Sequence, residues 1–483
     1  MPHHRSGKSG NECGGSEIVP PIGPIAAVFM ARPPGEAARV GYTPGIMSEE
    51  ATPTPSHVLK PHARPIQPMP VQKEGKQFVA LRDPSMLIQQ TMVVQPQALS
   101  VVQLFEGELD TTAIAERLVA AETPDRESVV KEARTQVEAL ATQMDQFGLL
   151  WGPKYEEYEK KLSETLHERG SLPLQASGSL VQLAAQARGG DEKPPEDADA
   201  QREWARELAV GMLETWMEQA EDPEFETPVV GLVVPHLDYV RGAEVYAGGY
   251  RAWVGAAKPD RVVILGTNHF GVGDGVVMTE LEHETPLGRV TPDRDVLAKL
   301  KEKLGDRLFK DELDLVPEHS IELHLPFLTH LFGDVPVVAA LMPDPLVPMI
   351  SDDGKRVSTP EFVKALGETL EEVGGLTYFV SSADLSHVGP QFGEPKPVDD
   401  DRRVEVERHD REHLGKFLEN DAAGFLEAME WCKNQTRWCS VGNMYAVASL
   451  AKAADIELID YKQASDDRGN HMVSVASLAF LGN

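Results

Sequence analysis

Cysteine is scarce in this chain of 483 residues, which contains only Cys13, Cys432 and Cys439. So few thiols cannot build the disulfide framework of a secreted protein, and we therefore expect a reducing, cytoplasmic setting. On one continuous helix Cys432 and Cys439 would lie about 10 Å apart, which is beyond disulfide reach. A turn at residues 433–436 would weaken this objection.

Long apolar runs and excess positive charge are also missing. No stretch approaches the roughly 20 continuous apolar residues that span a bilayer, and the mean hydropathy is −0.29. Lysine and arginine number 46 against 77 aspartate and glutamate, which gives a net charge of −31. Because a surface of that sign repels phosphates, we expect neither a membrane nor nucleic acid as a partner.

The composition divides the chain into four parts. Residues 1–75 are rich in Pro, Gly, Ser and His and predict disorder, and residues 1–46 are hypothesised to be an over-extended translation. Residues 76–155 combine short strand patterns with helical ones, which predicts a small helical domain with a winged-helix-like strand pair. Residues 156–224 predict a helical linker, and residues 225–483 predict the domain that carries the chemistry.

In that last part, β-type apolar runs alternate with helical patterns. The alternation is typical of an α/β fold with a mostly parallel sheet and flanking helices. Between two of these units we expect a hairpin in which residues 275–279 pair with residues 288–291. Ligands of such sheets bind at the carboxyl ends of the strands, so the side chains that follow the strands are the candidates for chemistry.

Histidines follow two of the predicted strands: His236 comes after Val229–Val234, and His269 comes after Arg261–Leu265. A single histidine is more often structural than a ligand, but repeated placement at strand ends favours convergence on one site. Imidazole suits Zn, Cu and Fe, and a thiolate or carboxylate would complete a three-ligand site with open positions. The candidates for the third ligand are Cys439, Glu322, Asp384 and Asp238.

Cys439 precedes an apolar helix predicted at Val441–Leu450, whose dipole would stabilise a thiolate. A small buried hydrophobic residue beside Trp438 is the alternative.

Two further clusters contain histidine. His319 is expected at a helix entry close to the site, whereas His324 lies about 140° away from it around a helix and is interpreted as structural. Asp384 and His387 stand three residues apart after the predicted strand Thr377–Val380. That spacing suits a carboxylate-oriented histidine acting as general acid or base, with an ordinary surface pair as the equally weighted alternative.

Five motifs occur in order along the second half of the chain. They are Pro235-His236, Gly266-Thr267-Asn268-His269, Glu284-Thr285-Pro286-Leu287-Gly288, Glu318-His319-Ser320-Ile321-Glu322-Leu323-His324-Leu325-Pro326-Phe327, and Asp384-Leu385-Ser386-His387 with Gly389. Together they resemble the Memo family, also called AmmeMemoRadiSam system protein B, over roughly residues 225–483. The small preceding domain is similar to PqqD-like peptide-binding domains and to the extra N-terminal domain of some bacterial members.

The resemblance implies a fold similar to class III extradiol dioxygenases and a site for Fe(II) or Cu, with Zn as a further option. It implies two histidine ligands, one cysteine ligand, and three further residues lining the same cavity. The ligands would be His236, His269 and Cys439, and the further residues His319, Asp384 and His387.

Two positions depart from the family pattern. Cys439 is followed by Ser440-Val441 before Gly442, whereas the family cysteine is usually followed directly by glycine. Asp238 stands where glycine is common, and we expect it to orient a ligand histidine by a hydrogen bond.

The sequence therefore predicts a metal-binding redox protein, with an oxygenase-like enzyme as the first hypothesis. The second is a non-catalytic, peptide- or protein-binding component of a radical-SAM-associated modification system. Its partners would be a radical SAM protein and AmmeMemoRadiSam system protein A. The third is a zinc-dependent hydrolase. In each case the small-molecule or peptide substrate is unidentified.

Overall fold

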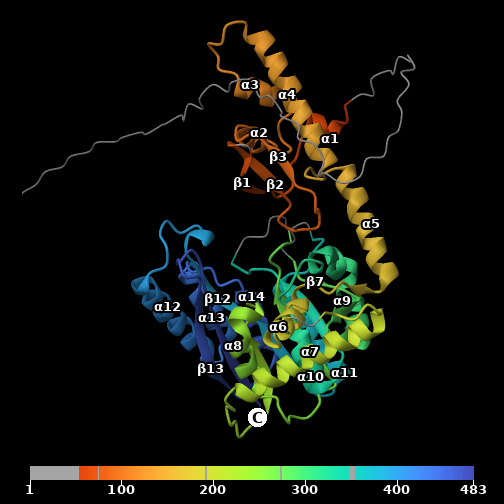
Figure 1. Cartoon of the computed structure of the whole chain (residues 1–483), viewed down its shortest axis with the longest axis vertical. Coiled ribbons are helices and arrows are strands. Elements are labelled where there is room, and N and C mark those ends of the chain that lie inside the picture. The colour runs from red at the N-terminus through yellow and green to blue at the C-terminus, as the bar shows by residue number, and fades with distance from the viewer. Residues whose placement is uncertain (1–53, 74, 191–192, 272–274, 347–353, 483) are drawn as a thin grey trace, which may run out of the picture. The chain divides into compact units, whose positions relative to one another are not determined.

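The computed structural model describes residues 54–73, 75–190, 193–271, 275–346 and 354–482. It separates into two compact units (Figure 1). The smaller comprises Met1–Pro84 and Ile88–Tyr158, and the larger comprises Ser85–Leu87 and Glu159–Asn483. The expected disorder and the over-extended translation of the first 46 residues lie outside the described residues.

The smaller unit is built around a three-stranded antiparallel sheet. In it, β2 (Lys76–Arg82) pairs with β1 (Gln67–Lys73) on one side and with β3 (Met92–Val94) on the other. The helices of this unit are α1 (Ser56–Leu59), α2 (Ala98–Val102), α3 (Thr111–Leu118), α4 (Arg126–Gln146) and the start of α5 (Pro153–Arg169). Their apolar faces enclose a core that includes Leu81, Val101, Ile114 and Met144.

Order in the smaller unit begins before residue 76. The strand β1 lies in the stretch interpreted as disordered, and two of its residues are Pro68 and Pro70. Because β1 is an edge strand, a residue without an N–H can be placed there without removing a ladder hydrogen bond. The prolines of residues 54–73 are therefore compatible with an ordered edge strand.

The larger unit is organised around an eight-stranded mixed sheet. The order is β12-β14-β5-β11-β6-β10-β7, and β13 pairs with β14. The four neighbouring parallel strands are β5 (Val229–Val234), β11 (Thr377–Ser382), β6 (Arg261–Thr267) and β10 (Val337–Met342). The antiparallel strands are β12 (Asp384–Val388), β14 (Met472–Leu481), β13 (Asp455–Ser465) and β7 (Val277–Met278). The predicted α/β class is confirmed, with a parallel centre and antiparallel strands toward both edges.

Helices cover both faces of this sheet. Alternate strand residues point to opposite faces, so Val234 and Ile264 belong to one core, and Val233 and Val263 belong to the other. The first core also contains residues of α7 (Ala198–Gln219), α8 (Tyr239–Arg251) and α10 (Leu325–Phe332). The second contains residues of α9 (Arg294–Leu304), α11 (Thr359–Val373), α12 (Asp400–Leu418), α13 (Ala422–Trp431) and α14 (Val441–Leu450). Burial on both faces explains why the central strands are near-continuous apolar runs.

The segment 156–224, interpreted as a helical linker, contributes to the first core. In addition to α7 it contains α6 (Ser179–Ala187), and the two helices pack against each other. Leu180, Leu213 and Met217 are buried in this core. These helices are therefore part of the body of the larger unit.

The predicted hairpin between residues 275–279 and 288–291 is wrong. The strand β7 pairs with β10, and β9 (Gly288–Val290) pairs with β8 (Glu282–Thr285). The reason is the tight turn between Thr285 and Gly288, which pair directly, because a two-residue loop joins β8 and β9 as a hairpin. A short strand β4 (Ser171–Leu172) extends this small sheet beside β8. Within the described ranges, no helix has the length and apolar character that crossing a membrane requires.

Candidate metal centre

Three neighbouring parallel strands bring polar residues together at their carboxyl ends. His236 follows β5, His269 follows β6, and Asp384 follows β11, which lies between them. Cys439 comes from a distant part of the chain, just before α14, which packs against β6 and β11. The sulfur of Cys439 and a ring nitrogen of each of His236 and His269 lie within 4.8 Å of one another. The three side chains interpreted as ligands thus converge on one point.

A chain of hydrogen bonds fixes the ring of His236. Its Nδ1 lies 2.9 Å from Ser382 Oγ, and that hydroxyl lies 2.5 Å from the carbonyl oxygen of Ser320. Because a carbonyl only accepts, the hydroxyl donates to Ser320 and must accept from His236 Nδ1. The ring proton therefore sits on Nδ1, and Nε2 lies 3.3 Å from Cys439 Sγ. Burial and the neighbouring histidines lower the pKa of His236 well below its ordinary value, so the ring is neutral.

Glu318 fixes the ring of His269. Its carboxylate accepts from His269 Nδ1 at 3.1 Å and from the backbone N–H groups of His269, His319 and Ser320 at 2.8–2.9 Å. Burial alone would raise the pKa of Glu318, but His269 and these hydrogen bonds lower it to about 2. Burial likewise acts to lower the pKa of His269, but Glu318 and Cys439 raise it well above its ordinary value. The surroundings of this ring therefore favour positive charge, and Nε2 is the nitrogen left for a cation.

The loop before α14 anchors Cys439. The indole of Trp438 is fully buried, and its Nε1 donates to Asp410 Oδ1 at 3.0 Å and to Ser386 Oγ at 3.1 Å. Helix α13 ends before Cys432, so the two cysteines flank a turn and not a continuous helix, and both thiols are free.

Helix α14 is itself tied to the ends of the strands. Asn443 Nδ2 donates to Thr267 Oγ1 at 2.8 Å and to the Ser382 carbonyl at 2.6 Å. A Cβ at Gly442 would lie 2.5 Å from the carbonyl oxygen of Pro343, so only glycine allows the helix to approach this closely. Gly442 stands two residues later than the glycine of the family pattern. Here it allows the close contact between α14 and the end of β10.

His319 lies beside the two ligand histidines. Its ring centroid is 4.9 Å from that of His269 and 5.6 Å from that of His236. Burial lowers its pKa to about 4, although its side chain is still 31% exposed. His324 points elsewhere: it is fully buried, and its Nδ1 lies 2.9 Å from Tyr250 OH. The structure thus places His319 beside His236 and His269, and His324 in the core.

Asp384 and His387 do not form the predicted pair. Asp384 Oδ1 accepts from the backbone N–H groups of His236 at 2.8 Å and Leu237 at 3.1 Å, and His387 Nδ1 is near two backbone carbonyls. Both residues belong to β12, in which a spacing of three residues spans about 10 Å, whereas on a helix they would be neighbours. Asp384 still borders the site, since its Oδ2 is 3.9 Å from His236 Nε2. Burial raises its pKa to about 7.

Two other predicted roles are also wrong. Asp238 caps α8, accepting from the Arg241 N–H at 3.3 Å and from its Nε at 2.7 Å, because a helix start favours an Asp at this position. It therefore orients neither ligand histidine. Glu322 turns away from the site and accepts from Ser177 Oγ at 2.6 Å and the Gln175 N–H at 2.9 Å. It is not available as the third ligand.

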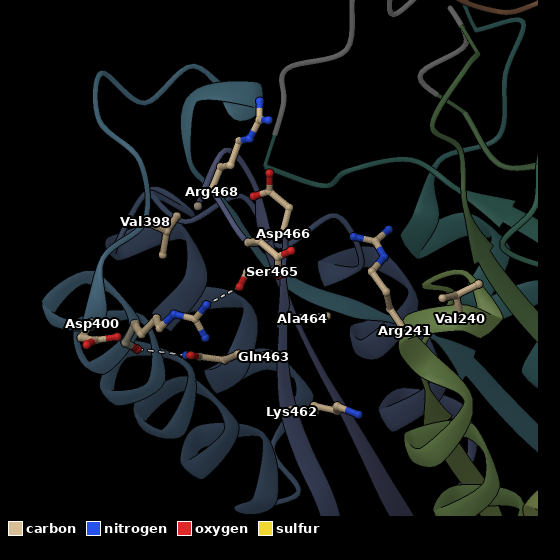
Figure 2. A pocket seen from close by; sticks show the side chains of 13 residues that line it. Val240, Arg241, Val398, Asp400, Lys462, Gln463, Ala464, Ser465, Asp466 and Arg468 are labelled. Atoms are coloured by element: carbon tan, nitrogen blue, oxygen red, sulfur yellow. Dashed lines mark hydrogen bonds between the residues drawn. The ribbon is translucent and has the colours of Figure 1, made fainter.

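A polar cavity of about 670 Å³ opens beside the first turn of α8. Figure 2 shows Arg241, Lys462 and Arg468 among the side chains that line it. Two of these cations have acidic partners, since Arg241 pairs with Asp238 and Lys462 pairs with Glu244. This cavity suits a polar ligand and lacks the apolar walls on which an aromatic ring would pack.

The residues that orient the candidate ligands do not stand out in the sequence. Glu318 and Ser382 select the ring tautomers, and Asn443 holds α14 against the strands. One signal was readable, because Asn443 is an amide side chain in a mostly apolar helical stretch. The partners of Ser382 could not be read, because they lie 62 and 146 residues away in the chain.

Comparison with known proteins assigns the larger unit. The family model described as Memo-like protein matches residues 201–481. A MEMO1 family protein of Pyrobaculum arsenaticum is 31% identical over 264 residues, which cover 53% of this chain and 85% of the relative. A MEMO1 family protein of Saccharolobus islandicus is 33% identical over 287 residues, which cover 56% of this chain and 88% of the relative. The chain therefore belongs to the Memo-like protein family.

Proposed function

We propose that the chain binds a transition-metal ion through His236 Nε2, His269 Nε2 and Cys439 Sγ, and that it is a redox protein working with iron or copper. The observation that carries this proposal is the convergence of the three donors within 4.8 Å. Hydrogen bonds to Nδ1 turn both imidazoles so that Nε2 faces the sulfur. Two imidazoles and a thiolate suit these metals, and three protein ligands leave a coordination position open.

A bound ion would supply one-electron chemistry and Lewis acidity at this point. The residues of the chain supply the rest. Glu318 and Ser382 keep the two imidazole rings oriented, and hydrogen bonds of this kind to the far nitrogen of a ligand ring raise metal affinity. His319, neutral at pH 7 and 31% exposed at its side chain, is placed to accept a proton from a molecule that binds beside His236 and His269. Asp384 borders the same point as a second proton-holding group.

Metal analysis of protein purified without air tests the proposal. Wild type should contain iron or copper, and His236→Ala, His269→Ala and Cys439→Ser should each lose most of it. His330→Ala is the matched control, because His330 lies on α10 outside the cluster. Unchanged metal content in the three ligand variants would overturn the assignment. Zinc as the native metal, without oxygen consumption, would favour a hydrolase instead.

A second candidate function rests on the smaller unit, which lies outside the residues that the family model matches. It is the capture of a peptide or protein within a radical-SAM-associated modification system. A pull-down with a chain lacking residues 76–155 separates the two functions. A scaffold should lose its partner on this deletion, whereas an autonomous redox enzyme should keep its metal and its oxygen consumption.

A further inference from the structure

We propose that the larger unit contains a second metal site, formed by His409, His413 and Cys432. One donor atom from each of these residues lies within 4.8 Å of the others. The two histidines are on α12, and the cysteine follows the last residue of α13. None of the three belongs to the cluster of His236, His269 and Cys439.

The two histidines present their rings on one face of α12. They are four residues apart, a spacing that places side chains one above the other on a helix, and their ring centroids are 4.2 Å apart. His413 Nδ1 lies 2.8 Å from the carbonyl oxygen of His409, so it donates there, and Nε2 is left as the ligand nitrogen. This is the arrangement that fixes the tautomer of metal-binding histidines.

One ring nitrogen of His409 lacks a hydrogen-bond partner in the described part of the chain, and a cation could bind to it. Its Nε2 is buried and finds no hydrogen-bond partner among the described residues. A buried polar atom without a partner destabilises the folded chain, so a ligand at this nitrogen would stabilise it. A metal ion bound by the three donors would give this nitrogen its partner.

Cys432 completes a donor set that suits zinc. Its Sγ lies 3.3 Å from the Met429 carbonyl oxygen, and the side chain is only partly buried, so an ion can reach it. Two imidazoles and one thiolate match the nitrogen and sulfur ligands of tetrahedral Zn²⁺, with the fourth position left to water. His409 also lines a cavity together with Glu405 and Glu412 and with Arg402 and Arg408, so solvent reaches this side of the cluster.

The site also has a structural consequence. The loop that begins at Cys432 ends at Cys439, so one thiol belongs to each cluster. An ion at the second site would fix the start of this loop against α12. We infer that it stabilises the loop that presents Cys439.

Cobalt binding by a single-thiol chain tests the proposal. In the full chain carrying Cys13→Ser and Cys439→Ser, Cys432 is the last of the three cysteines. Addition of Co²⁺ should produce the near-ultraviolet absorption of a thiolate bound to cobalt, at one ion per chain. Replacing His409 by Asn in this background should weaken binding by at least about tenfold. A further Cys432→Ser change should abolish the absorption.

Zinc stoichiometry gives an independent reading. Equilibrium dialysis of the His236→Asn/His269→Asn chain should still find one Zn²⁺, and adding His409→Asn and Cys432→Ser should remove it, whereas adding His330→Asn should not. Circular dichroism must show that each variant is folded, and Zn²⁺ should raise the thermal midpoint only where Cys432 and His409 are intact. Absence of both the cobalt absorption and the retained zinc in folded protein would overturn the second site, whatever the outcome at His236 and His269.

Discussion

The rings of His236 and His269 are chemically identical, but their hydrogen-bond partners make them different candidate ligands. The Ser382 hydroxyl holds His236 as a buried neutral ring, and the Glu318 carboxylate holds His269 in surroundings that favour positive charge. Different hydrogen bonds therefore orient the two rings so that both Nε2 atoms face the same point. Disturbing one partner should affect one ligand only.

Glu318→Gln should weaken metal binding by about 10–100-fold without unfolding the protein. The amide of Gln has one acceptor oxygen instead of two and no negative charge, so it holds the Nδ1–H tautomer of His269 less firmly. Competition titration with a chelator measures the affinity. Glu322→Gln is the matched control, since Glu322 is a buried carboxylate that also accepts backbone N–H groups but contacts neither ligand. Equal affinity losses in both variants would show that the effect is structural.

His283 should make the protein less stable in acid. It is 5% exposed, neither ring nitrogen has a partner among the described residues, and burial lowers its pKa to about 4 from 6.5. The unfolded chain therefore binds a proton below pH 6.5 that the folded chain does not accept until about pH 4. This contribution to stability is present above pH 6.5 and lost as the pH falls.

We expect His283→Leu to lose about 2 kcal/mol less unfolding free energy than wild type between pH 7 and pH 5. Urea denaturation followed by circular dichroism measures both losses. If His283→Leu lost as much stability as wild type, a buried neutral His283 would be ruled out.

Among the helices and strands, α14 is the element that positions Cys439. Its first turn is locked to β6 and β11 by Asn443 and lies against the end of β10 through Gly442. The position of Cys439 above the strand ends follows from these contacts.

Gly442→Ala should displace the start of α14, lower metal affinity and destabilise the protein by about 1–3 kcal/mol, because the added methyl meets a backbone carbonyl. Gly415→Ala on α12 is the control: a Cβ there meets nothing within 4 Å, and we expect it to stabilise by about 0.5–1 kcal/mol. Thermal unfolding and metal titration of the two variants measure both effects. Unchanged metal affinity in folded Gly442→Ala would show that the contact does not position Cys439.

The central strands could be predicted from sequence, and the edge of the sheet could not. Parallel strands buried on both faces are apolar runs, so β5, β6, β10 and β11 stand out, and with them the residues at their ends. In contrast, β12 alternates acidic, hydroxyl and imidazole side chains with apolar ones directly after β11 and reads as a loop. The Asp384–His387 pair is predicted from a spacing of three residues, which does not bring side chains together on a strand. The partners Ser382 and Glu318 were missed because their bonds join residues distant in sequence.

At the scale of the whole molecule, the candidate chemistry belongs to the larger unit. Both clusters and the residues that hold them lie between His236 and Ser474, inside the range that the family model matches. We therefore expect removal of residues 1–152 to leave metal content per chain unchanged. Metal analysis and circular dichroism of the shortened chain measure this. Loss of metal from a folded shortened chain would give the smaller unit a part in metal binding.

Trp438 has a consequence for both clusters. Its ring centroid lies 6.1 Å from that of His413, and the next residue in the chain is Cys439. An indole this close to both places is quenched by a paramagnetic or redox-active ion and not by zinc. With one cluster removed by mutation, emission from this side chain would report which kind of ion occupies the other. The protein thus carries an optical probe of its own metal content.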